Sequence, residues 1–249
     1  MVTKAISRLK GSIRSMTGRF AITWLGHGTF ILTTPGGARI VIDPWLEGNP
    51  RCPPQWKRVS QAELILVTHG HHDHVGDLVQ TARATSAPVV AVAELCRWLE
   101  TKGLQRLLPM NKGGTLSIDD VQVTMVPAEH SSGWLERGAM VYVGEPVGYV
   151  LTLENGLKLY FAGDTAVFGD MRLIREMYSP SIAFLPIGDR FTMGPDGAAR
   201  ACELLGVRQV VPMHYGTFPS LTGTPDRLRE LLAGKETEVL ELEPGETAS

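Results

Sequence analysis

The residues best suited to chemistry lie in one short segment, Thr68-His69-Gly70-His71-His72-Asp73-His74. It holds four of the seven histidines in the 249-residue chain, and the apolar run before it predicts a strand over 64–68. His69 and His71, two apart on an extended segment, can converge on one cation, while Asp73 and His74 lie beyond a turn and can reach a second. Imidazole nitrogens and carboxylate oxygens are ordinary ligands of zinc and related divalent metals. The segment therefore predicts a metal site, with His72 pointing away from it.

Three later motifs also follow predicted strands and match further ligands of a known family: Ala128-Glu129-His130-Ser131, Phe161-Ala162-Gly163-Asp164-Thr165 and Pro212-Met213-His214-Tyr215-Gly216. With the histidine segment, they resemble the metallo-β-lactamase-fold superfamily over residues 20–242. The resemblance implies an α/β protein, a four-layer αβ/βα sandwich with metals at the edge between its two sheets. It also implies the ligand sets: His69, His71 and His130 on one metal, Asp73, His74 and His214 on the other, with Asp164 bridging.

The resemblance implies two divalent ions. Some members of the superfamily place a cysteine ligand where this chain has Asp164, and Cys52, Cys96 and Cys202 lie outside every motif. Nitrogen and oxygen ligands alone favour zinc and also accept manganese or iron. Narrower motifs resemble the ascorbate-6-phosphate-lactonase-like hydrolases: Trp24-Leu25-Gly26-His27-Gly28-Thr29-Phe30, Ile42-Asp43-Pro44, 163–171 and 191–195.

Other polar residues near the motifs have two interpretations each. Asp43 can accept the ring N–H of a ligating histidine or cap a turn. His27 is a substrate or proton-transfer contact, or a packed hairpin histidine. Tyr215 donates to a leaving group or oxyanion, or packs as an aromatic side chain. We count Asp73, His27 and Tyr215 as the catalytic candidates.

A predicted loop after the strand at 182–186 supplies candidate substrate contacts. It carries Asp189, Arg190 and Thr192, and loops at strand ends often carry function. Arg190 pairs with a substrate phosphate or carboxylate, or is simply solvated. The apolar residues between 133 and 147 form a lid over the site or pack in the core.

Two cations in such a site hold a bridging water, lower its pKa toward neutrality and present hydroxide to a carbonyl or phosphorus centre. The chain is therefore interpreted as a dinuclear metal-dependent hydrolase of a small ester, lactone or phosphoester. One alternative is a phosphodiesterase acting on a phospholipid or small diester. The other is a non-catalytic metal-binding regulatory module, which missing ligands would indicate; here none is missing.

The elements that position these residues follow from hydrophobic periodicity and turn residues. Strands are predicted at 20–25, 30–33, 39–43, 64–68, 88–93, 115–118, 121–126, 148–153, 157–162, 182–186, 207–213 and 238–242. Helices are predicted at 76–85, 94–102, 170–178, 195–205 and 226–232, and Asn155-Gly156 predicts a hairpin turn. Two groups of strands, each followed by helices, predict two packed sheets with helices outside.

Charge separates a basic start from the rest of the chain. Residues 1–19 carry five of the 24 basic residues and no acid, which leaves 19 basic against 26 acidic groups, a net −7. We divide the chain into a basic extension at 1–19 and a hydrolase domain at 20–249. The extension is loosely ordered, docks as a helix on the body or another subunit, or contacts a membrane surface. The acidic body predicts a small-molecule substrate and no nucleic acid. We expect a cytoplasmic protein without stable membrane insertion, and leave a homo-oligomer open.

Overall fold

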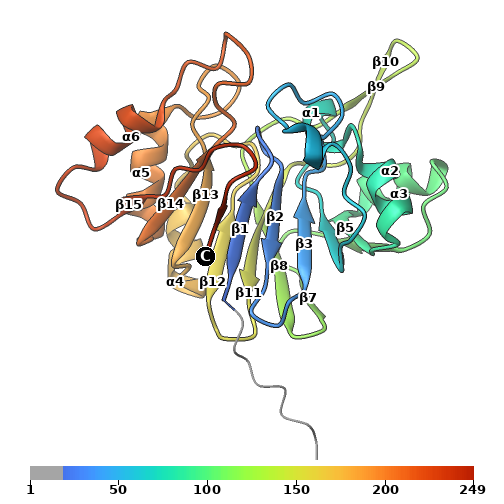
Figure 1. Ribbon diagram of the computed structural model, residues 1–249, viewed down its shortest axis with the longest axis horizontal. Coiled ribbons are helices and arrows are strands. Elements are labelled where there is room, and N and C mark those ends of the chain that lie inside the picture. The colour runs from blue at the N-terminus through green and yellow to red at the C-terminus, as the bar shows by residue number, and fades with distance from the viewer. Residues whose placement is uncertain (1–18) are drawn as a thin grey trace, which may run out of the picture.

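Short apolar strands build two seven-stranded sheets in the computed structural model, which describes residues 19–249 (Figure 1). The first sheet has the order β16-β1-β2-β3-β4-β5-β6. Its strands are β1 (Ala21–Trp24), β2 (Phe30–Thr33), β3 (Arg39–Ile42), β4 (Leu64–Leu66), β5 (Val89–Val92), β6 (Leu107–Met110) and β16 (Thr247–Ala248). Pairing is antiparallel from β16 to β3 and parallel from β3 to β6.

The second sheet is also mixed and has the order β15-β14-β13-β12-β11-β8-β7. Its strands are β7 (Thr115–Ile118), β8 (Val121–Pro127), β11 (Val147–Thr152), β12 (Lys158–Phe161), β13 (Ile182–Pro186), β14 (Gln209–Met213) and β15 (Glu238–Val239). Strands β12 to β15 run parallel, so their carboxyl ends share one edge. A separate hairpin consists of β9 (Trp134–Glu136) and β10 (Ala139–Val141).

Helices cover the outer side of each sheet, as predicted (Figure 1). The helices are α1 (His72–Val75), α2 (Leu78–Thr85), α3 (Ala93–Thr101), α4 (Met171–Tyr178), α5 (Pro195–Leu205) and α6 (Pro225–Leu232), with a 3-10 turn at Pro54–Trp56. Helix α3 packs on β5 and β6, and α5 packs on β13 and on its neighbours α4 and α6.

The core lies between the sheets. The ring of Phe30 from β2 packs edge-on against Phe161 of β12 and Phe184 of β13, with centroids 5.7 Å and 5.1 Å away. Tyr149 of β11 donates its hydroxyl to the Val67 carbonyl of the opposite sheet at 2.7 Å. These contacts pack the two sheets against each other, and the Tyr149 hydrogen bond lies immediately after the end of β4.

Most predicted elements are present, with shifted ends. The Asn155-Gly156 turn joins β11 to β12, and Gly156 has the positive φ of 81° that favours glycine. Helix α2 begins at Leu78 rather than at 76; Asp77 is its N-cap residue, and its carboxylate accepts from the distant Leu46 N and Glu47 N. The strands predicted over 207–213 and 238–242 are shorter than expected.

Several elements were not predicted: α1, β6, β9, β10 and β16. Strand β6 contains Pro109 and lies at a sheet edge, where a missing N–H is tolerated. No helix within residues 19–249 is both long and apolar enough to cross a bilayer. The predicted basic extension lies outside the described residues apart from Arg19.

Candidate metal centre

The seven predicted ligands lie together at one edge of the sandwich, where strands of both sheets end. They come from five places in the fold: His69 and His71 after β4, Asp73 and His74 in α1, His130 after β8, Asp164 after β12 and His214 after β14. The short helix α1 stands at this edge (Figure 1). Strand ends of two packed sheets can therefore gather residues that are far apart in sequence.

The first set consists of His69, His71 and His130. One ring nitrogen from each lies within 4.8 Å of those of the other two, close enough for one cation. His69 Nε2 and His71 Nδ1 are 3.0 Å apart. The extended segment with one residue between them brings these two rings together, as the spacing predicts.

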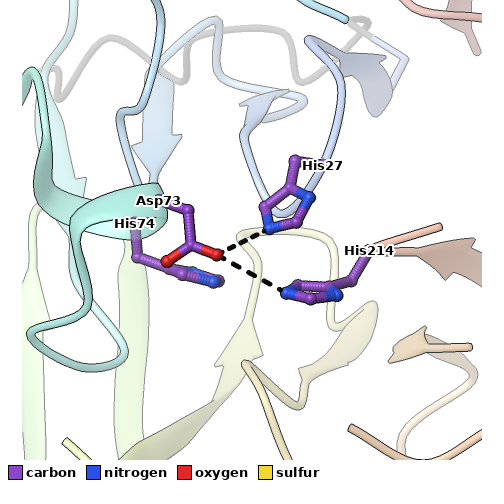
Figure 2. Close-up of side chains that lie close together, drawn as sticks. All are labelled: His27, Asp73, His74 and His214. Atoms are coloured by element: carbon purple, nitrogen blue, oxygen red, sulfur yellow. Dashed lines mark hydrogen bonds and ion pairs between the residues drawn. The ribbon is translucent and has the colours of Figure 1, made fainter. Parts of the chain in front are cut away.

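The second set consists of Asp73, His74 and His214, and the structure adds His27 to it. One donor atom from each of the four lies within 4.8 Å of the others. Figure 2 shows the Asp73 carboxylate facing the rings of His27 and His214 from one side, with Oδ2 3.0 Å from His27 Nε2 and 3.9 Å from His214 Nε2. Sequence reasoning placed His27 near the cleft without finding it in this set.

Asp164 lies between the two sets. Its Oδ2 is 3.0 Å from His214 Nε2 and 3.3 Å from His74 Nε2 in the second set. In the first set, the same oxygen is 3.7 Å from His130 Nε2 and 3.9 Å from His69 Nε2. One carboxylate oxygen thus faces histidines of both sets, which is where a bridging ligand must lie.

Several buried atoms of the centre have no hydrogen-bond partner within residues 19–249: His74 Nε2, Asp164 Oδ1 and both ring nitrogens of His214. The approaches of His74 and His214 to Asp164 fall within ion-pair distance but lack hydrogen-bond geometry. An unpaired buried polar atom costs about 1–3 kcal/mol. Such a concentration of free nitrogen and oxygen donors fits divalent cations such as zinc, manganese or iron.

Asp43 orients one histidine in each set. It is fully buried, and its Oδ2 accepts from His74 Nδ1 at 2.8 Å and from Thr68 Oγ1 at 2.6 Å. Because that hydroxyl donates to Asp43, it accepts from His69 Nδ1, 3.0 Å away. Both rings then keep Nε2 free to bind a cation. Burial alone would lower the pKa of His74, but the carboxylates of Asp164 and Asp43 outweigh it and raise that pKa.

His27 is held from both sides of its ring. Nε2 donates to Asp73, and Nδ1 lies 2.9 Å from Thr217 Oγ1, which donates to it in the neutral ring. The side chain is fully buried, with Trp45 edge-on at 5.2 Å between centroids. His27 therefore reaches a substrate only through Asp73.

Burial controls the histidine charges of the first set and of His27. It lowers the pKa of His69 well below the usual value and also lowers those of His71 and His130, and neighbouring histidine charges add to the effect. Burial and the charge of His214 lower the pKa of His27 to about 4. Metals bind neutral imidazole, so these environments hold the rings in the binding form.

Burial raises the pKa of Asp43, whereas Asp164 and Asp73 have lowered pKa values despite burial. Burial would raise the pKa of Asp164, but the charges of His214 and His74 outweigh it and hold that pKa well below the usual range. Burial also opposes ionisation of Asp73, where the hydrogen bond from His27 is the largest opposing effect and the pKa falls. Negative charge is thus concentrated where cations would bind.

Three residues of the centre adopt the left-handed backbone conformation: His27 at φ 56°, Asp43 at 48° and His214 at 59°. Residues other than glycine rarely adopt positive φ, and those that do are concentrated at functional sites. Each lies just beyond a strand, where the chain must turn sharply to direct the side chain into the edge.

The centre opens to solvent on one side. The Asp73 side chain is 30% exposed, whereas that of Asp164 is 3% exposed. His71 and His130 are partly exposed, and His69, His74 and His214 are buried. A substrate approaching this opening meets Asp73 first among the carboxylates.

Known proteins are similar to this chain in sequence and in fold. Residues 38–215 match the beta-lactamase superfamily domain. A UPF0173 metal-dependent hydrolase of Solibacter usitatus is 52% identical over 224 residues, which cover 90% of this chain and 97% of that protein. The chain belongs to the UPF0173 metal-dependent hydrolase family. The predicted superfamily is thereby confirmed.

Solved structures support the same fold for this UPF0173 protein. Igni18, a metallo hydrolase from the archaeon Ignicoccus hospitalis, superposes with a TM-score of 0.81 at 33% identity, covering 92% of this chain and 97% of that one. The metallo-β-lactamase fold protein YhfI from Bacillus subtilis gives a TM-score of 0.68 at 13% identity, covering 92% and 98%. The predicted αβ/βα sandwich is confirmed.

Other candidates of this UPF0173 chain lie outside the two sets. Tyr215 stacks on Trp24 at 5.2 Å between centroids and belongs to the core, which favours the packed alternative; its proton-donor role stays a prediction. Arg190 lies exposed over the ring of Phe191, and Thr192 donates its hydroxyl to the Met193 carbonyl. Their substrate contacts also stay predictions.

The exposed His72 is in neither set, as expected.

Proposed function

We propose that this UPF0173 protein is a dinuclear hydrolase in which His69, His71 and His130 hold one divalent ion and Asp73, His74 and His214 hold the other. Asp164 is the proposed bridge. Zinc is the expected metal, and the donor set also accepts manganese or iron. The supporting observation is the single Asp164 oxygen that faces nitrogens of both sets, beside buried donor atoms without partners.

The chain's own residues prepare the centre for hydrolysis. Divalent ions bound there would lower the pKa of water and polarise the bond to be cleaved. Asp43 fixes the tautomers of His74 and, through Thr68, of His69. His27 orients Asp73, the carboxylate nearest the opening, which we propose accepts and returns a proton there.

A carboxylic ester or lactone is the proposed substrate bond. Within residues 19–249, the carboxylates of the centre form ion pairs with histidines alone, so no lysine or arginine is held beside them. Enzymes often bind phosphate groups through arginine side chains. The side chains paired with the carboxylates of this centre are histidines instead. The resemblance to lactonase-like hydrolases supports the same class.

Metal content and turnover test the proposal together. Protein purified without chelator should contain two metals per chain and hydrolyse a member of a panel of lactones, carboxylic esters and phosphodiesters. Asp164→Ala should lose both metals and His130→Ala mainly one, because only Asp164 faces both sets. His72→Ala is the matched histidine control and should keep both metals.

Two outcomes would contradict the proposal. Absence of metal after growth with zinc and manganese would refute a metal centre. Loss of a single metal in both Asp164→Ala and His130→Ala would refute the bridge. Turnover of phosphodiesters alone would replace the ester assignment and leave the dinuclear centre standing.

A further inference from the structure

Large exposed apolar side chains gather at the edge that carries the metal centre. Of the seven in residues 19–249, two lie on α4, and the other five lie on the hairpin beyond β8 or on the loops after β13 and β14: Leu135, Met140, Tyr142, Phe191 and Phe218. Exposed apolar patches are uncommon on soluble proteins and mark binding surfaces.

A row of aromatic rings connects the centre to the hairpin. Phe218 lies 5.9 Å from the His27 ring and 6.0 Å from Trp45, measured between centroids. Trp45 lies 6.5 Å from His72, which lies 5.6 Å from Trp134 of β9. We call Phe218, Trp45, His72 and Trp134 the aromatic rim.

The rim adjoins the opening of the centre. His72 directly precedes Asp73, the exposed carboxylate, and Phe218 directly follows Thr217, which binds the His27 ring. Phe218 is 39% exposed, so part of its ring is free to contact a ligand. A ligand whose polar group reaches Asp73 thus has rings of the rim beside its remaining atoms.

The hairpin has two different faces. Leu135 and Met140 pair across β9 and β10 and share one face, with 65% and 70% of their surfaces exposed. Trp134 and Val141 form the opposite face, which packs against the core. Gly70, between two predicted ligands, donates its N–H to Ser132 Oγ before β9, and a Cβ at Gly70 would meet Val143 Cγ2, after β10, at 2.1 Å. The base of the hairpin therefore contacts the segment that carries these ligands.

We propose that the rim binds an extended apolar chain of the substrate, and that the natural substrate is an ester or lactone bearing a medium-length acyl or alkyl chain. This inference rests on the proposed function, because the polar head of that substrate would lie at the metal centre. The chain would bury the exposed part of Phe218 and then lie along His72 toward Trp134, with the buried ring of Trp45 behind them. A water-soluble substrate with no apolar part would leave these surfaces without a role.

Straight-chain carboxylates, from acetate through butanoate to octanoate, test the proposal as analogues of the acid product. Calorimetry with the metal-loaded protein should show affinity rising about three- to fourfold per methylene beyond butanoate, the gain expected for burying a CH₂ group. Phe218→Ser should flatten this rise while acetate affinity and metal content stay unchanged. Phe218→Leu keeps an apolar side chain and should restore most of it.

Matched variants separate the rim from exposed apolar surface in general. Trp134→Ser should weaken octanoate binding, whereas Leu135→Ser with Met140→Ser on the opposite face of the hairpin should not, although that pair is more exposed. Equal losses in both variants would overturn the proposal. Sedimentation of the same proteins tests whether a second copy covers the rim; a dimer that Phe218→Ser or Trp134→Ser dissociates, with octanoate binding unchanged, would also overturn it.

The outcomes distinguish this inference from the function on which it rests. Acetate binding and ester turnover without any dependence on chain length would overturn the rim as a chain site and leave the hydrolase proposal intact. Failure of every carboxylate to bind, together with no turnover by the metal-loaded protein, would overturn both.

Discussion

Asp43→Asn tests how the metal centre is held in shape. The buried carboxylate accepts three hydrogen bonds: from Thr68 N at 2.8 Å, from Thr68 Oγ1 at 2.6 Å and from His74 Nδ1 at 2.8 Å. The first ends on Oδ1 and the other two on Oδ2. Asparagine has nearly the same shape, but its NH₂ group cannot accept a hydrogen bond. Whichever way the amide lies, at least one buried donor faces that NH₂ group.

The magnitude follows from these contacts. A buried donor without an acceptor costs about 1–3 kcal/mol, which we expect as a loss in the unfolding free energy of the metal-free protein. Removing a partner that orients a ligating histidine lowers metal affinity by about 10- to 100-fold. Because Asp43 orients His74 directly and His69 through Thr68, we expect this loss at both metals.

Competition with a chromophoric chelator measures the metal affinity, and guanidinium unfolding of the metal-free protein measures stability. Asp77→Asn is the control, because Asp77 also accepts from backbone groups, Leu46 N and Glu47 N, and bonds to no predicted ligand within residues 19–249. Both bonds end on Oδ2, whose place the amide oxygen of asparagine can take, so this variant should keep metal affinity and most of its stability. Wild-type metal affinity in Asp43→Asn would refute the reasoning.

Three further expectations concern thiols, packing and acid. Burial raises the pKa of Cys52 and Cys96 to about 11 and that of Cys202 to about 12. Because the thiolate is the reactive form, Ellman's reagent at neutral pH should titrate none of them in the native protein and all three after denaturation. Prompt reaction of the native protein would contradict their burial. A Cβ at Gly28 would lie 2.8 Å from His74 Cε1, so Gly28→Ala should weaken metal binding about tenfold or more by overpacking, as chelator competition would show. Gly169→Ala, with nothing within 4 Å, should not. Metal content and rate should fall together toward acid, because protons compete for the ligand histidines. Because Asp164 and Asp43 raise the pKa of His74 whereas burial lowers that of His69, we expect the loss to begin at the second set as the pH falls. A rate that persists after the metal has left would contradict metal-dependent hydrolysis.

The histidine segment at 69–74 was predictable because its information is local. Each ligand motif follows an apolar run that predicts a strand, and the carboxyl ends of such strands meet at one edge of a sandwich. The spacing of His69 and His71 alone indicates two rings on one cation, and their Nε2 and Nδ1 atoms lie 3.0 Å apart. The positions of His130, Asp164 and His214 needed the resemblance, since no spacing connects them.

His27 was harder to place because its partners are distant in sequence. Asp73 lies 46 residues away and Thr217 lies 190 residues away. Its position also depends on a positive φ in the bend after β1, which residue type does not reveal for histidine. The glycines on either side of His27 were the available signal of this bend, because glycine-rich segments predict tight turns.

The hairpin of β9 and β10 was missed for a different reason. Its strands have three residues each and expose much of their surface, so they lack the apolar alternation of a half-buried strand. Arg137 and Gly138 both adopt positive φ, as a tight hairpin turn requires, but only the glycine signals it. The core alternative for 133–147 is wrong for Leu135, Met140 and Tyr142, which are exposed.

The division of the predicted ligands between the two sheets has a consequence for folding. His69, His71, Asp73 and His74 come from the first sheet, and His130, Asp164 and His214 from the second, so each set contains members of both. A cation held by either set would act as a cross-link between two halves that the chain joins only through loops. Its binding energy would become folding energy, about 2.7 kcal/mol per site when free metal is 100-fold above its dissociation constant. The thermal stability of such a protein would then report the metal supply of its surroundings.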